Sequence, residues 1–102
     1  MLRKITRTHY LVWGQDLVYV ELNTCCGQVL NFKVIYYTIV NDVKHQVIRY
    51  DCSHGFPHKH DLTKKTPKRE ELPNLPLKNL MEMALEDIEK NWKKYKNQYK
   101  RT

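Results

Sequence analysis

The sequence predicts an α+β fold, in which an antiparallel sheet carries one C-terminal helix packed on a face. Residues 2–51 contain no proline and are rich in β-branched and aromatic side chains, which favours paired strands. Residues 76–99 instead place apolar side chains at every third or fourth position, which is the spacing of an amphipathic helix. We therefore expect a meander of four to five strands covered by one long helix.

Turn-forming residues separate the strands that the first half of the chain predicts. We expect strands at 3–13, 17–23, 29–40 and 43–51, and a short fifth strand at 58–62. The turns between the first four fall at Gly14-Gln15-Asp16, Cys25-Cys26-Gly27 and Asn41-Asp42. The segment 29–40 is apolar on both faces over its second half, so we expect it to be a central strand.

A two-residue turn at Asn41-Asp42 fixes the pairing of the hairpin that contains it. In that register Val34 faces Arg49 and Phe32 faces Asp51. Arg49 and Asp51 then share a face at the end of the hairpin, because alternate residues of a strand point to the same side.

We treat residues 1–102 as a single domain in three parts. The β-meander and a histidine-rich loop occupy 1–62, a linker occupies 63–75, and a basic amphipathic helix occupies 76–102. The linker, TKKTPKREELPNL, is charged and contains prolines, so we expect a mobile surface connection. The helix would be about 36 Å long at 1.5 Å per residue, and its last turns are expected to overhang the sheet or to meet a second copy in a homodimer.

The basic end of this helix interleaves lysines with Trp92, Tyr95 and Tyr99. These aromatic residues either stack on RNA bases or continue the apolar stripe of the helix. We favour the second interpretation, with the rings packed on the sheet or on a second subunit and the lysines solvated.

The chain carries a formal charge of +7, with 18 Lys and Arg against 11 Asp and Glu. Such a charge favours a polyanionic partner such as RNA. Three cysteines, two of them adjacent, form a poor disulfide framework, so we expect reduced thiols. No apolar run approaches the roughly 20 residues that span a bilayer, and the N-terminal stretch lacks the apolar segment of a signal peptide. We therefore expect no membrane association and a cytoplasmic location.

The stretch RYDCSHGFPHKHDL, residues 49–62, concentrates the side chains with the most chemistry. Pro57 fixes the backbone just before His58, Lys59 and His60. In an extended segment the two histidines point to one side, with Cα atoms about 6.6 Å apart, while Lys59 points to the other. One chemistry that suits these residues is a zinc site, for which the candidate ligands are Cys52, His54, His58 and His60. Their spacing matches no common zinc-finger pattern.

The other chemistry is RNA cleavage without a metal or any other cofactor. One histidine, His58 or His60, would take the proton of a ribose 2′-hydroxyl and the other would protonate the leaving oxygen. Both protonation states are available at neutral pH, because the unperturbed pKa of histidine is about 6.5. The remaining candidates are Arg49 and Lys59, which would hold the phosphate, and Asp51 and His54, which would orient these groups.

Plainer interpretations exist for the same residues. The stretch is also compatible with a polar surface loop in which Asp51 only pairs with Arg49 or caps a turn. Lys64 and Lys65, beside the proposed site, either bind and steer RNA or belong to a flexible charged linker.

The run VIRYD followed by FPHKH resembles the small prokaryotic family of toxin components called TumE. Members of that family carry an Arg-Tyr-Asp strand end and a histidine cluster that contains Pro-His. The resemblance covers residues 36–60, about a quarter of the chain, and the matching positions are Arg49, Tyr50, Asp51, His58 and His60. It implies a ribonuclease-type toxin that works beside a small antitoxin protein. The chain departs from the family pattern at Cys52, where asparagine is common, and in its long basic helix.

The leading hypothesis is therefore a toxin-like RNA endonuclease, with Tyr50 added to the substrate-binding candidates by the resemblance. The alternative is a non-catalytic module that binds nucleic acid or protein, in which the Cys/His cluster is structural or holds zinc.

Overall fold

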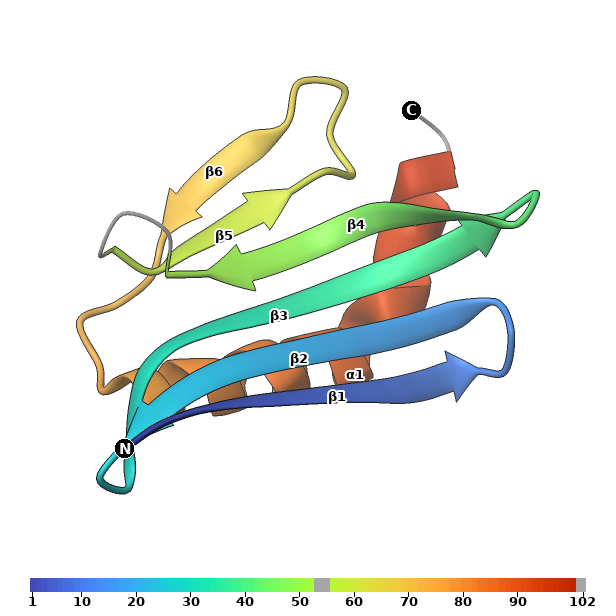
Figure 1. The fold of residues 1–102 in the computed structure, drawn as a ribbon. Helices are drawn as coiled ribbons and strands as arrows, with labels where there is room; N and C mark the ends of the chain where they lie inside the picture. Colours follow the sequence, from blue (N-terminus) through green and yellow to red (C-terminus); the bar gives the residue numbers. More distant parts are fainter. Residues whose placement is uncertain (53–55, 101–102) are drawn as a thin grey trace.

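A computed structural model describes residues 1–52 and 56–100, and it confirms the α+β meander. The strands are β1 (Leu2–Val12), β2 (Asp16–Cys25), β3 (Gln28–Val40), β4 (Val43–Asp51), β5 (His58–Asp61) and β6 (Lys68–Glu71). They lie in the sheet in the order of the sequence, and each pairs antiparallel with the next. The helix α1 (Leu77–Lys100) crosses one face of the sheet, as Figure 1 shows. No helix in the described part of the chain is long and apolar enough to cross a bilayer.

β6 lies inside the segment that we expected to be a mobile linker. Its residues pair with β5, from Glu71 opposite His58 to Lys68 opposite Asp61. The sequence KREE has low β-propensity, so its composition does not indicate a strand, and the pairing with β5 decides its conformation. Among the described residues the sheet thus has six strands instead of the four to five expected, and the linker prediction is wrong for this segment.

Two hairpins close with turns that require a left-handed backbone. Asn41 and Asp42 have φ angles of 52° and 63°, and Cys26 and Gly27 have φ angles of 56° and 77°. Two consecutive positive φ angles in a two-residue loop are typical of the type I′ turn, which matches the twist of the strands that it joins. The two-residue turn predicted at Asn41-Asp42 is confirmed.

β4 contains one residue more than β3 can pair. Tyr37 pairs with Gln46 and Tyr36 pairs with Ile48, so Val47 between them forms a β-bulge. Val47 and Ile48 are both fully buried in the core between the sheet and α1. The bulge therefore directs two successive apolar side chains of β4 into the core.

The bulge also changes the face on which the end of β4 presents its polar residues. Asp51 pairs with Lys33 and not with Phe32. Arg49 pairs with Ile35 and not with Val34. The expected pairings are therefore wrong, because they assumed an unbroken register. The prediction that Arg49 and Asp51 share a face is confirmed, but this face is the one opposite α1.

The core lies between α1 and the face of the sheet that the helix covers. Its buried members are Val18, Phe32, Val34, Tyr36, Val47, Ile48, Tyr50, Leu80, Ala84, Ile88 and Tyr95. The aromatic residues at the end of α1 contribute to this packing. The rings of Trp92 and Tyr36 meet at a centroid distance of 6.3 Å, and the hydroxyl of Tyr99 lies 3.4 Å from Nδ1 of His45. The favoured interpretation of the aromatic stripe, packing on the sheet, is confirmed. The expectation that the lysines are solvated is wrong for Lys96, whose ammonium pairs with the buried Asp16.

A buried carboxylate ties the end of α1 to the sheet. Asp16 is fully buried, and its carboxylate accepts a hydrogen bond of 2.7 Å from the hydroxyl of Tyr36 and lies 2.8 Å from Nζ of Lys96. Burial, together with this hydrogen bond and the charge of Asp16, raises the pKa of Tyr36. The contacts join β2, β3 and α1 through one charge.

We expect the Asp16→Ala variant to lose about 3 kcal/mol of unfolding free energy, because it leaves the ammonium of Lys96 and the hydroxyl of Tyr36 without their acceptor. Urea titration followed by circular dichroism measures this loss. The control is Glu82→Ala, which removes an exposed carboxylate from α1. Equal stability of the two variants would show that the Asp16 contacts do not stabilise the fold.

Candidate functional site

The face of the sheet opposite α1, which we call the open face, brings four predicted side chains together. In the pairing of β4 with β5, Arg49 lies opposite His60 and Asp51 lies opposite His58. β6 adds Arg69, which pairs with His60. Paired residues of neighbouring strands point to the same side of a sheet, so these five side chains share the open face. We call Arg49, Asp51, His58, His60 and Arg69 the open-face cluster.

Asp51 is the buried centre of the open-face cluster. Its side chain is 4% exposed, with Oδ2 at 2.8 Å from Nε of Arg49 and Oδ1 at 3.8 Å from Nε2 of His60. Within the described residues, the buried Nε–H of Arg49 has no acceptor aligned for a hydrogen bond, so its contact with Asp51 is an ion pair without hydrogen-bond geometry. The carboxylate thus holds a guanidinium on one side and an imidazole on the other.

The two imidazoles lie side by side but differ in access to solvent. Their ring centroids are 6.3 Å apart. His58 is 5% exposed, and Nη2 of Arg69 lies 3.2 Å from its Nδ1 and 3.0 Å from its Nε2. The side chain of His60 is 23% exposed. His60 is therefore open to a ligand on this face, whereas Arg69 covers His58.

The surroundings of His60 favour its neutral form. Burial lowers the pKa of His60, and the positive charges of Arg49 and Arg69 lower it further, which together outweigh the opposite effect of Asp51. Since unperturbed histidine titrates near pH 6.5, the His60 ring is mostly neutral at pH 7 and able to accept a proton.

Lys59 and Tyr50 lie on the other face, under α1. Nζ of Lys59 is 3.5 Å from a carboxylate oxygen of Asp87 and donates a hydrogen bond of 3.0 Å to the hydroxyl of Tyr95. The hydroxyl of Tyr50 donates to Asp87 as well. Lys59 and Tyr50 alternate along their strands with the cluster residues, so they face away from any ligand bound there. We correct their expected role accordingly: they anchor the helix and do not bind the same substrate.

The Asp87 site is a second buried charge network between sheet and helix. Burial by itself would raise the pKa of Asp87, but hydrogen bonds from Tyr50, Tyr95 and Asn91 and the charge of Lys59 hold the pKa below its usual value. The same contacts keep Lys59 charged, because the hydrogen bond with Tyr95 and the charge of Asp87 raise its pKa against the effect of burial.

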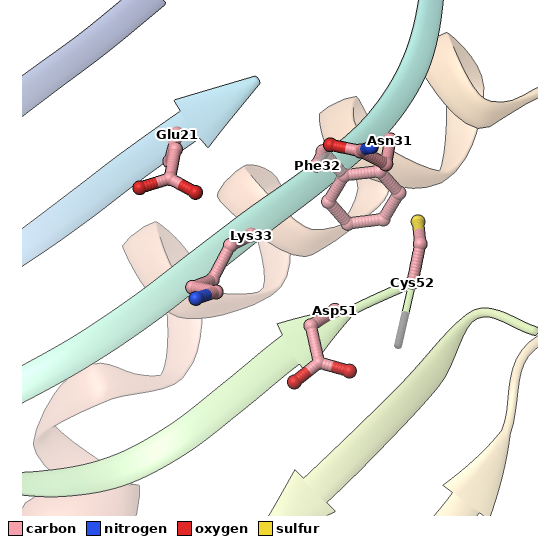
Figure 2. Close-up of a pocket in the computed structure, with 6 residues that line it drawn as sticks. All are labelled: Glu21, Asn31, Phe32, Lys33, Asp51 and Cys52. Atoms are coloured by element: carbon pink, nitrogen blue, oxygen red, sulfur yellow. The ribbon is translucent and has the colours of Figure 1, made fainter. Parts of the chain in front are cut away.

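A shallow hollow of about 230 Å³ adjoins the open-face cluster at Asp51. Figure 2 shows the residues that line it, which are Glu21, Asn31, Phe32, Lys33, Asp51 and Cys52. Sequence reasoning missed Lys33, which adds a positive charge, and Glu21, whose carboxylate lies 3.5 Å from Nζ of Lys4. It also placed Arg69 only in the expected linker. Finding these residues requires the register of the bulged strand and the presence of β6.

The remaining candidates do not join the cluster in the described part of the chain. His54 lies outside the described residues. Lys64 and Lys65 are exposed in the connection between β5 and β6. Burial raises the pKa of the Cys52 thiol, which disfavours the thiolate that a metal binds. Among residues 1–52 and 56–100, no group of three or more His, Cys, Asp or Glu is arranged to hold a metal ion.

Residues 6–102 match a protein family described as a domain of unknown function (DUF7718), and the chain belongs to this family. The match spans nearly all of the sheet, the open-face cluster and α1, so these parts belong together in the family domain. Comparisons with curated proteins and with solved structures found no match. The family description assigns no activity, and the resemblance to the TumE toxins stays a prediction.

We expect the Arg49→Gln variant to raise the pKa of His60, because it removes a nearby positive charge while the negative charge of Asp51 still stabilises the imidazolium. NMR titration of the histidine ring protons measures the change. Lys93→Gln removes an exposed lysine of α1 and is expected to leave the pKa of His60 unchanged. If the pKa of His60 is the same in Arg49→Gln and in the unmodified protein, the charge of Arg49 does not act on His60.

We expect acid unfolding to depend on Asp87. Its folded-state pKa is depressed, so the ionised carboxylate stabilises the fold above its unfolded pKa of about 4, and this contribution is lost as the pH falls through the folded-state value. Asp87→Asn should therefore be less stable at neutral pH and should lose less stability on acidification. Urea unfolding at a series of pH values, with Glu82→Gln as control, tests this. Parallel pH profiles for Asp87→Asn and the unmodified protein would refute it.

Proposed function

We propose that the chain is a metal-independent RNA endonuclease whose active site is the open-face cluster, as in a toxin that works beside a small antitoxin protein. The observation that carries this proposal is the meeting of two imidazoles, two guanidinium groups and a buried carboxylate on one solvent-facing side of the sheet. These are the groups that general acid–base cleavage of a phosphodiester needs.

The composition of the open face supports RNA as the substrate. Arg49 and Arg69 supply positive charge beside His60, in a chain of formal charge +7. Tyr19 and Tyr37 lie on the same face of β2 and β3 and are partly exposed. Aromatic rings stack on unpaired bases while arginines bind the phosphates, so this arrangement suits a single strand.

The proposed reaction begins with the neutral ring of His60, which accepts the proton of a ribose 2′-hydroxyl. The 2′-oxygen attacks the phosphorus, the bond from phosphorus to the 5′-oxygen breaks, and the imidazolium of His58 gives its proton to that oxygen. The products are a 2′,3′-cyclic phosphate and a 5′-hydroxyl end. Asp51 positions His60 and Arg49, and Arg69 must move from His58 to the phosphate for the acid to reach the leaving group.

The cover over His58 favours a second candidate function. His58 is 5% exposed and in contact with Arg69, and both features are also typical of a structural histidine. In that case the open face binds RNA through Arg49, Arg69 and His60 without cleaving it. The two candidates share a ligand and differ only in whether a bond is broken.

We expect the purified protein to cleave single-stranded RNA in the presence of EDTA, and the His60→Gln variant to cleave at least about 100-fold more slowly while still binding it. His9→Gln, the same change on exposed β1, is the control and should remain active. Gel analysis of product ends and a binding titration measure both properties. Binding without cleavage would replace the endonuclease by the binding module, and the absence of both would refute the proposed site.

A further inference from the structure

β1 forms an unusually long free edge of the sheet. Its 11 residues pair with β2 on one side, and within residues 1–52 and 56–100 no strand lies on its other side. The opposite edge is β6, which has 4 residues, and Figure 1 shows how far β1 extends beyond that length. Natural proteins usually keep edge strands short or covered, because their unpaired N–H and C=O groups accept another strand. Only the β6 edge is shortened in this way.

The side chains of β1 restrict which strand can pair with it. Leu2–Val12 contains Arg3, Lys4 and Arg7, all of them exposed, and no Asp or Glu. A second copy paired antiparallel about the centre of the strand would place the two Arg7 side chains opposite each other. Like charges in that position destabilise the pairing, whereas carboxylates there would stabilise it. The edge therefore disfavours self-association and suits an acidic strand.

An exposed aromatic pair lies at the end of the same edge. Tyr10 is 40% exposed and Trp13 is 81% exposed, and their ring centroids are 4.5 Å apart. Large aromatic side chains at a surface are common anchors of protein interfaces. The pair offers an apolar contact to a segment that runs along β1.

We propose that β1 is a docking edge for an extended acidic segment of a partner protein, which adds to the sheet as a seventh strand. Main-chain hydrogen bonds to β1 supply the register. Carboxylates on one side of the added strand face Arg3 and Arg7, and apolar residues on its other side pack on Tyr10 and Trp13. This surface lies at the far side of the sheet from β5 and β6, so it does not depend on the proposed RNA cleavage.

The probe is a synthetic peptide of about ten residues that alternates Glu and Val, with a Lys-Val peptide for comparison. Added to the full chain, the Glu-Val peptide is expected to shift the Trp13 indole resonance and to slow amide hydrogen exchange at alternate residues of β1. The Arg7→Glu variant should bind it about tenfold more weakly. Lys93→Glu makes the same charge change on exposed α1 and should bind it as the unmodified protein does.

Three outcomes would overturn this proposal. One is binding without protection of β1 amides, and another is an equal loss of affinity in Arg7→Glu and Lys93→Glu, since both would reflect attraction to the overall charge. The third is a dimer, detected by light scattering, in which β1 amides are already protected without peptide, because a second copy would then occupy the edge.

Discussion

One extra residue in β4, Val47, determines which side chains face α1 and which face solvent. A strand alternates its side chains with a period of two, so a single inserted residue moves all that follows it to the other side. Without the bulge, Arg49 and Asp51 would lie under the helix among apolar residues. With it, they reach the open face, where His60 and His58 of β5 lie opposite them.

The same alternation separates the charges of β4 and β5 into two groups with different roles. On the covered face, Tyr50 and Lys59 meet Asp87 of the helix at hydrogen-bonding or ion-pair distance. Buried charges of this kind favour one orientation of the helix, because any other would leave them unpaired. On the open face, His60 keeps access to solvent beside Asp51. One set of ionisable groups thus holds the helix, while the neighbouring set lies on the open face.

Much of this arrangement follows from the sequence. The sequence predicts the turn at Asn41-Asp42, the strand at 43–51 and a helix from residue 76, because turn residues and apolar spacing agree there. The structure has the same turn and strand, and its helix begins at Leu77. Alternation predicts that Arg49 and Asp51 share one side of their strand and that His58 and His60 share one side of theirs. The pairing of β4 with β5, which brings the four side chains together, is seen only in the structure. The bulge at Val47 is not predicted either, since valine suits an unbroken strand equally well, and its position depends on the fit of two buried side chains against the helix.

Arg69 and Lys59 show why the sequence does not predict which residues belong to the open-face cluster. Arg69 belongs to it unexpectedly, and Lys59 was expected to bind the substrate there but lies on the other face. Arg69 belongs to the segment KREE, whose low β-propensity does not predict a strand. The segment is a strand because it pairs with β5. Lys59 has the right charge and the right neighbours in the sequence, yet its direction along the strand carries it to Asp87. Proximity in the sequence therefore identifies the cluster but not its full membership.

The most direct measurement of the central claim is the pattern of nuclear Overhauser contacts across β4 in solution. With the bulge at Val47, His60 lies opposite Arg49, and the Tyr50 ring is buried in the same core as Leu80 of α1, so Overhauser contacts are expected within each of these two pairs. Contacts between Arg49 and Leu80, with Tyr50 turned to solvent, would place the end of β4 in the unbroken register and contradict the account.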